Sequence, residues 1–112
     1  GRMGPVLERF SDMGVDVLNP LEPPPMGDIT LGEAFDRLDG RMGIEGNIET
    51  HDIMRMEPEN FRHLVAETVE IGRGERFIIC PSSGYMENPQ PTDRQIRNLL
   101  TFVNYGVECA EG

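Results

Sequence analysis

Side chains that could do chemistry gather in three short segments of this sequence. Glu22 and Glu45 carry carboxylates, Asn47 carries an amide, and Ser83 and Tyr85 carry hydroxyls. Two carboxylates that meet on one rim can act as a general acid and a general base when burial raises the pKa of one of them. Amides and hydroxyls orient ligands through hydrogen bonds. We therefore take Glu22, Asn47, Ser83 and Tyr85 as candidate substrate-binding residues.

Each of these residues also has a simpler explanation. Acidic loop residues are commonly solvated in a chain whose formal net charge is −10. Asn47 follows Gly46, a pair typical of a tight turn, and this turn interpretation is favoured over ligand binding. The Ser-Ser-Gly segment at 82–84 is also ordinary turn chemistry. Tyr85 could line a pocket or only pack over the end of the fold.

Several kinds of site are disfavoured by residue type and spacing. His51, His63, Cys80 and Cys109 show no metal-ligand spacing, so we expect no metal site, and Cys80 is better explained as the buried end of an apolar strand. All ten basic residues other than the histidines are arginine. A Schiff-base lysine and a phosphate-loop lysine are therefore excluded.

The candidate residues follow three apolar runs that predict β-strands, at 15–18, 42–44 and 77–80. The segments that leave these runs, 19–28, 45–49 and 81–89, hold the carboxylates, amide and hydroxyls. In α/β proteins, the segments at the carboxyl ends of parallel strands form the binding face. We therefore expect all three segments to converge on one side of a parallel sheet.

Helical periodicity recurs four times between and around these strands. Two helices should begin with capping boxes, Thr30 with Glu33 and Thr92 with Gln95, and a third should have Pro58 in its first turn. Glycines should end the last three helices. The four apolar faces, in chain order, are Val6, Leu7, Phe10 and Met13; Leu31, Ala34, Phe35 and Leu38; Phe61, Leu64, Val65 and Val69; and Ile96, Leu99, Leu100 and Val103. The second helix should end at Gly40, the third at Gly72 and Gly74, and the fourth at Gly106. The alternation of helix and strand predicts an α/β fold with crossover helices.

The bulk composition limits the partners and the compartment. The chain has 112 residues, 38% of them hydrophobic, which is enough for one domain with a modest core. Its acidity disfavours nucleic acid and anionic membrane surfaces as partners. Two cysteines are too few for a secreted disulfide scaffold, and no signal peptide or membrane span is visible, so we expect a cytoplasmic protein. The start at Gly1 suggests a chain cut from a longer one.

Two strings of the sequence resemble the uroporphyrinogen decarboxylase family. Gly46-Asn47-Ile48-Glu49, ahead of an acidic residue and a proline that start a helix, resembles that family's Gly-Asn-Leu/Ile-Asp segment. The run from Phe77 to Gly84, followed by a proline-rich loop and then Tyr105-Gly106, resembles its last barrel strand and closing helix. The resemblance covers residues 2–106. It implies that residues 1–112 form a single partial domain, about three βα units from the C-terminal third of a (β/α)8 barrel.

The resemblance also implies two activities for a parent enzyme. Members of the family include decarboxylases that remove acetate-arm carboxyls from uroporphyrinogen, in porphyrin biosynthesis, without a cofactor. Others are corrinoid-linked methyltransferases that use a thiolate-bound zinc, and the string at 18–25 is closer to that branch. We expect the parent to be a carboxy-lyase acting on a tetrapyrrole. A corrinoid ligand or a zinc ion is expected only under the methyltransferase alternative.

Ser83 departs from both branches. The position before Gly84 carries a functional histidine in the decarboxylases and a zinc-binding cysteine in the methyltransferases, which makes Ser83 the candidate catalytic position. A serine hydroxyl does not titrate near neutrality and is a poor zinc ligand. The family's catalytic aspartate, carboxylate-binding arginines and first zinc ligands would precede Gly1. Only Arg2, Arg41 and Arg55 are placed to contact a polyanionic substrate, so we expect this chain to be inactive alone.

Three strands cannot close a barrel, which takes eight βα units. One sheet face, with side chains such as Val17, Ile44 or Ile78, and both sheet edges should therefore be exposed. We expect the chain to self-associate. A non-catalytic α/β domain that acts by assembly is the alternative from outside the enzyme classes.

Overall fold

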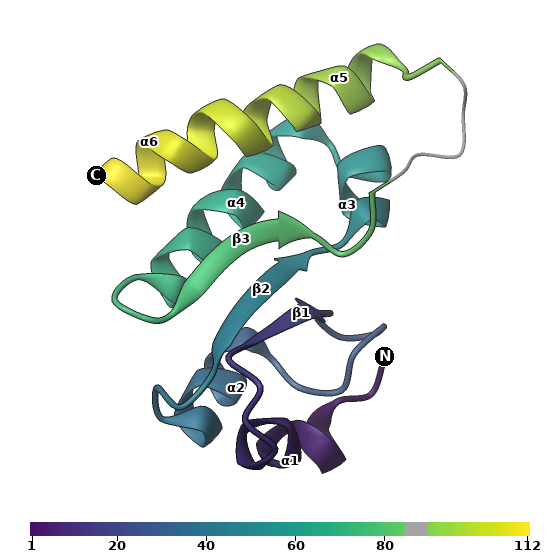
Figure 1. Ribbon diagram of the computed structural model, residues 1–112. Helices are drawn as coiled ribbons and strands as arrows, with labels where there is room; N and C mark the ends of the chain where they lie inside the picture. Colours follow the sequence, from purple (N-terminus) through teal and green to yellow (C-terminus); the bar gives the residue numbers. More distant parts are fainter. Residues whose placement is uncertain (85–89) are drawn as a thin grey trace.

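The computed structural model describes residues 1–84 and 90–112 and shows an α/β fold. Strands β1 (Val17–Leu21), β2 (Gly43–Ile48) and β3 (Phe77–Pro81) form a parallel sheet in the order β1-β2-β3 (Figure 1). The strands are neighbours in the order in which they occur along the chain. The predicted parallel sheet with crossover helices is confirmed.

The helices lie close to their predicted positions, with one addition. The short helix α1 (Leu7–Asp12) precedes β1, α2 (Leu31–Leu38) connects β1 to β2, and α4 (Pro58–Gly72) connects β2 to β3. A further helix, α3 (Thr50–Arg55), begins directly after β2 and was not predicted. It is a single short segment without a long apolar period, so periodicity gave no signal for it.

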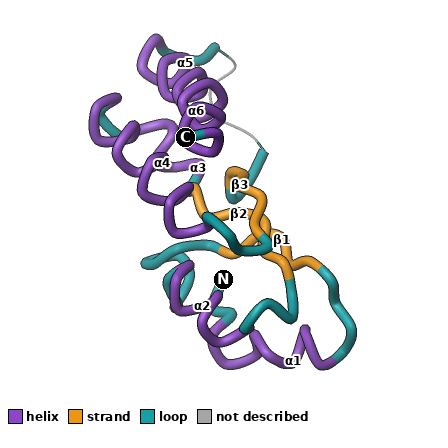
Figure 2. The backbone as a smooth tube through the Cα atoms, turned by 90° about the vertical axis from the view of Figure 1, so that its left-hand side faces the viewer, coloured by secondary structure: helices purple, strands orange, loops and turns teal. Residues whose placement is uncertain are grey.

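Two hydrophobic clusters join the helices to one face of the sheet. The first joins α1 and α2 to β1 and β2, and the second joins α3 and α4 to the end of β2. Figure 2 shows α2 and α4 on the same side of the strands. The strand side chains that belong to these clusters or pack against them are Leu18, Leu21, Ile44, Ile48, Phe77 and Ile79. This face is the covered face of the sheet.

The opposite face of the sheet, which we call the open face, carries the alternate strand residues. Val17 is 44% exposed and Ile78 is 60% exposed. Ile44 was expected among them, but it is only 1% exposed and belongs to the first cluster, so that prediction was wrong. Strand residues alternate between the two faces of a sheet. Ile44 points to the same face as Phe77, its register partner on β3, which is the covered face.

The strands β1 and β2 extend farther than predicted. Residues up to Leu21 and Ile48, assigned to loops from the sequence, pair within the sheet. Gly46 permits this at a kink where its φ is 142°. A Cβ atom at Gly46 would lie 2.8 Å from the carbonyl oxygen of Leu21, so only glycine allows the two backbones to approach this closely.

The last helix differs most from its prediction. Helix α5 (Asp93–Leu100) continues through a π-helix (Thr101–Tyr105) into α6 (Gly106–Glu111), and Gly106 does not end it. We call this continuous helix, residues 93–111, the C-terminal rod (Figure 1). Its capping box, Thr92 with Gln95, is complete as predicted. At Thr30 the hydroxyl accepts from the Glu33 backbone as predicted, but the Glu33 carboxylate accepts from that hydroxyl instead of from the Thr30 backbone.

The buried side of the C-terminal rod is partly polar. Gln95 and Asn98 are 4% and 0% exposed, whereas Ile96 and Leu100, which were predicted to be buried, are 42% and 56% exposed. The Asn98 amide donates to the carbonyl oxygens of Ile53 and Met56, at 2.9 and 3.0 Å. These bonds hold α3 and its exit against the rod. With this polar pair at buried positions, the helix is rotated from its expected orientation, although Leu99 packs against the second cluster.

Candidate functional site

The carboxyl ends of the strands meet a hollow of about 450 Å³. Its walls come from residues 24–26 after β1, residues 49–52 and 54 at the start of α3 and along it, and residues 82–83 after β3. These segments share one rim, as the sequence predicted. One wall is apolar and the other carries hydroxyls and carboxylates. The residues that line it are Pro24, Pro25, Met26, Glu49, Thr50, His51, Asp52, Met54, Ser82 and Ser83.

Hydroxyl groups connect β3 to the start of α3 inside this hollow. The Ser83 hydroxyl donates to Thr50 Oγ1 at 2.9 Å, and the Ser83 backbone N–H donates to the same oxygen at 3.0 Å. The Thr50 hydroxyl donates to the Ser83 carbonyl oxygen at 2.8 Å. The Thr50 backbone N–H donates to Ser82 Oγ at 3.1 Å. Ser83 therefore has a fixed position on the rim, with its hydroxyl in a hydrogen-bond network.

Glu49 lies at the N-terminal end of α3, between the network and the strand end. The Ser82 hydroxyl donates to Glu49 Oε2 at 3.3 Å. The other carboxylate oxygen, Oε1, is buried and has no hydrogen-bond partner among the described residues. Burial raises the pKa of Glu49, and the nearby charge of Glu22 raises it further, while the bond from Ser82 opposes the shift. Such a carboxyl holds a proton more readily than a solvated one.

A second carboxyl of the hollow, Asp52, occupies the first turn of α3. Burial raises its pKa, and the neighbouring His51 acts in the opposite direction. Glu49 and Asp52 therefore both resist ionisation more than solvated acids do. Carboxyls with raised pKa values are suited to general acid chemistry. The predicted pair was Glu22 with Glu45, and the structure instead brings the charge of Glu22 to Glu49.

The other predicted site residues are placed apart from this hollow. Glu22 follows β1 and contacts the Gly1 amino nitrogen at 2.9 Å. Asn47 has a φ of 102°, which supports the turn interpretation, and its amide donates to the Leu21 carbonyl oxygen at 3.1 Å. Tyr85 lies outside the described residues. Among the predicted site residues that the structure describes, Ser83 alone lines the hollow.

Glu45 belongs to a polar group on the open face. The Asn19 amide donates to Glu45 Oε2 at 2.5 Å and lies 3.8 Å from Cys80 Sγ. Burial raises the pKa of the Cys80 thiol, and the Glu45 carboxylate raises it further. Cys80 is half-buried here, on the same face as Ile78, and was predicted to be a buried strand end. A thiol with a raised pKa is a weak nucleophile.

Glu49, Thr50, Asp52 and Ser82 line the hollow but were not predicted as site residues. Thr50 and Asp52 follow the Gly46–Glu49 string directly, and a threonine at that point could have indicated a helix start. Ser82 was assigned to a turn together with Ser83. The expectation of no metal site stays a prediction. Within residues 1–84 and 90–112, no three histidine, cysteine or acidic side chains are grouped as metal ligands would be.

Comparison with known proteins gives no match: no protein-family model, curated protein or solved structure is similar to this chain. Among the helices of the described ranges, none has the length and apolarity needed to cross a membrane.

Proposed function

We propose that this chain is a C-terminal segment of a barrel enzyme of the uroporphyrinogen decarboxylase superfamily and supplies part of its substrate-binding rim. The observation that carries the proposal is the one-sided sheet. Its parallel strands follow the order β1-β2-β3, and the helices pack on the covered face while Val17 and Ile78 remain exposed on the other. A doubly wound sheet has helices on both faces, whereas a closed barrel has them on the outside only.

The place of the hollow supports an enzymatic role for the parent. Active sites of (β/α)8 barrels lie at the carboxyl ends of the strands, and the hollow with Glu49, Ser82 and Ser83 lies there. Ser83 holds the position that the resemblance marks as diagnostic. Its hydroxyl donates to Thr50 and supplies neither an imidazole nor a thiolate. Residues from the rest of the parent must complete the chemistry, so the isolated chain should be inactive.

The leading activity is that of a carboxy-lyase acting on a tetrapyrrole, which the resemblance implies. Glu49 and Asp52 line the hollow, and no arginine of the described ranges does. Arg2 lies 4.0 Å from Asp28, and Arg41 donates to the carbonyl oxygens of Leu38 and Arg37. Cations that bind the substrate carboxylates would therefore come from elsewhere in the parent.

A corrinoid-dependent methyltransferase is the second candidate, and the same acidic lining favours it. A hollow that presents Glu49 and Asp52 beside Met26 and Met54 suits a neutral or cationic group better than a carboxylate. The described residues do not fit a zinc ion, because Ser83 replaces the cysteine and no other group of metal ligands is present in the described part of the chain.

A chimera tests the proposal. In a uroporphyrinogen decarboxylase, the C-terminal third of the barrel is replaced by this chain, and decarboxylation of uroporphyrinogen is assayed. We expect a folded and inactive chimera, and measurable activity after Ser83→His but not after the control change Ser82→His. A chimera that does not fold, or a folded Ser83→His chimera without activity, would contradict the decarboxylase assignment.

The methyltransferase candidate is tested in the same way in a corrinoid methyltransferase host. Ser83→Cys should then restore a zinc ligand, measured as zinc content after removal of loosely bound metal. Zinc content equal to that of the unsubstituted chimera would reject this candidate. The two hosts separate the two activities.

A further inference from the structure

A second hollow, a groove of about 450 Å³, runs along the C-terminal rod beside α4. The rod supplies most of its lining, and α4 supplies Arg62. The groove shares no lining residue with the hollow at the strand ends. Its volume is within the range of about 300–1,000 Å³ that is typical of small-ligand sites.

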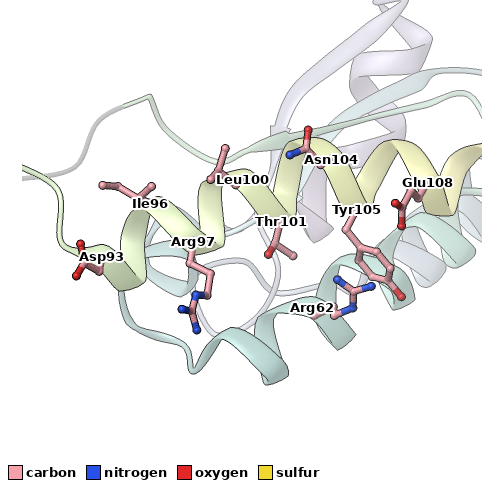
Figure 3. A pocket seen from close by; sticks show the side chains of 9 residues that line it. All are labelled: Arg62, Asp93, Ile96, Arg97, Leu100, Thr101, Asn104, Tyr105 and Glu108. Carbon is pink, nitrogen blue, oxygen red and sulfur yellow. The ribbon is translucent and has the colours of Figure 1, made fainter.

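Two arginines from different helices meet at this groove. In Figure 3, Arg97 points from the rod toward α4, and Arg62 points from α4 toward the rod. Within residues 1–84 and 90–112, neither forms an ion pair, although the chain has 20 acidic residues. Arg94, one turn before Arg97, pairs with Glu57 at 3.0 Å. The positive charges of Arg62 and Arg97 are therefore not neutralised by the described part of the chain.

Tyr105 holds one of these arginines in place. The guanidinium carbon of Arg62 lies 3.5 Å from the centroid of the Tyr105 ring. Such a stack uses the flat face of the guanidinium and leaves the N–H groups at its edge free to donate. Because the fork is held before a ligand arrives, less conformational entropy is lost when a carboxylate or phosphate binds.

The groove coincides with the irregular turn of the rod. The π-helix begins at Thr101 and ends at Tyr105, and both residues line the groove. Single π turns within α-helices are rare and frequently occur at functional sites. This observation is independent of the two arginines and points to the same place.

The opposite edge of the groove is apolar. Ile96 and Leu100 line it and are 42% and 56% exposed. In Figure 3 they point away from α4, whereas Arg97 points toward it. A ligand that lies along the rod therefore meets aliphatic carbon on one side and guanidinium groups on the other.

Two acidic residues limit what the groove can bind. Asp93 and Glu108 are both exposed and lie at opposite ends of its lining (Figure 3). Their charges oppose a long polyanion such as nucleic acid, as does the net charge of the chain, −10. A short ligand with one anionic group avoids both acids.

We propose that this groove binds a small ligand with one carboxylate or phosphate group and an apolar body. The guanidinium groups of Arg62 and Arg97 bind the oxyanion, and Ile96 and Leu100 pack against the body. The proposal goes beyond the barrel assignment and does not depend on it, because the groove is formed by the rod and α4 alone. The groove is shallow and solvated, so we expect a Kd on the order of 1 mM for a simple aromatic anion.

Phenyl phosphate and benzoate are the probes, each titrated into the full chain to about 20 mM at constant ionic strength and followed by NMR. At least one should give saturable shifts of the backbone amide resonances of Arg62, Thr101 and Tyr105. Tighter binding of phenyl phosphate would assign a phosphate ligand, and tighter binding of benzoate a carboxylate ligand. Inorganic phosphate should bind at least about fivefold more weakly than phenyl phosphate, because it has no apolar body. Phenyltrimethylammonium, with the same ring and a positive charge, should not bind.

Substitutions test the role of each group. Arg62→Gln and Arg97→Gln should each raise the Kd of the tighter probe at least about fivefold, because each removes charge-assisted hydrogen bonds. Arg9→Gln, at an exposed position of α1, is the matched control and should change the Kd by less than about twofold. Tyr105→Phe should keep the affinity, since its ring still supports Arg62. Circular dichroism shows whether each variant is folded.

Several results would overturn the proposal. One is the absence of saturable shifts with either anion, and another is phenyltrimethylammonium or inorganic phosphate binding as tightly as the better probe. Folded Arg62→Gln and Arg97→Gln variants that both bind like the unsubstituted chain would also contradict it.

Discussion

The two faces of the sheet differ in what their side chains contact. The covered face contributes Leu18, Ile44 and Phe77 to a packed core, whereas the open face combines Val17 and Ile78 with a polar group. That polar group is linked by hydrogen bonds from the exposed Asn19 to Glu45 and Cys80, which are half-buried. A solvent face of an antiparallel sheet is usually polar throughout. The mixed character of the open face is what the barrel proposal expects of strands whose inner face lacks its partners.

The strongest test of this difference compares the same substitution on the two faces. Ile44→Ala should lower the free energy of unfolding by about 2–5 kcal/mol, because it leaves a cavity in the first cluster. Ile78→Ala should lower it by less than about 1 kcal/mol, since little apolar area is lost at an exposed site. Ile44 is 1% exposed and Ile78 is 60% exposed. Urea unfolding at low protein concentration measures both values.

Equal losses for the two alanine variants would mean that the open face is covered in solution. That result would contradict the claim that the side of the sheet with Val17 and Ile78 is uncovered in this chain.

A second test concerns the contact between the C-terminal rod and α3 on the covered side of the sheet. Asn98→Ala should lower the free energy of unfolding by about 1–3 kcal/mol, because the carbonyl oxygens of Ile53 and Met56 lose their donor. Asn104→Ala is the matched control at an exposed position of the same helix and should change stability by less than about 0.5 kcal/mol. A similar loss in both variants would mean that Asn98 does not hold α3.

A smaller effect is expected at the rim, where the two faces meet. The folded-state pKa of Glu49 is raised, so its ionisation destabilises the fold as the pH rises through that pKa. Glu49→Gln removes this ionisation and keeps an acceptor for Ser82. The variant should gain stability relative to the unsubstituted chain at neutral pH, and the gain should disappear below the pKa of an unfolded glutamate, about 4.3.

Urea unfolding at several pH values measures the effect of Glu49→Gln. Glu59→Gln, in the first turn of α4, controls for the change of one surface charge. A Glu49→Gln variant that loses stability at neutral pH would show that the carboxylate form is needed.

Local signals in the sequence predicted much of the fold. These signals depend only on residues close together in the sequence, and the structure contains each of them. They are Pro58 at a helix start, the capping pair of Thr92 and Gln95, and the three apolar strand runs. Glycine was less informative. Gly106 was expected to end a helix, but it packs near Val65 of α4, where it fits in the middle of a continuous rod.

The site was harder to predict because it depends on long-range contacts. Ser83 was named from the sequence, but its partner Thr50 comes from a helix that periodicity does not reveal. Glu22 was paired with Glu45, but Glu45 lies within β2 on the open face, in register with Ile78, where it accepts from Asn19. The orientation of the last helix was predicted from its aliphatic residues. The buried side instead carries the amide of Asn98, which donates to two carbonyl oxygens at the end of α3.

The reactivity of Cys80 tests most directly whether the open face is the interior of a larger barrel. The rate at which a small thiol reagent modifies Cys80 is measured by mass spectrometry in this chain and in the folded chimera with the decarboxylase. Cys109, half-buried against the second cluster on the covered side, is the internal reference. We predict that modification of Cys80 slows at least about tenfold in the chimera while Cys109 is unchanged, because access controls thiol reactivity. An equal rate at Cys80 in both proteins would contradict the account.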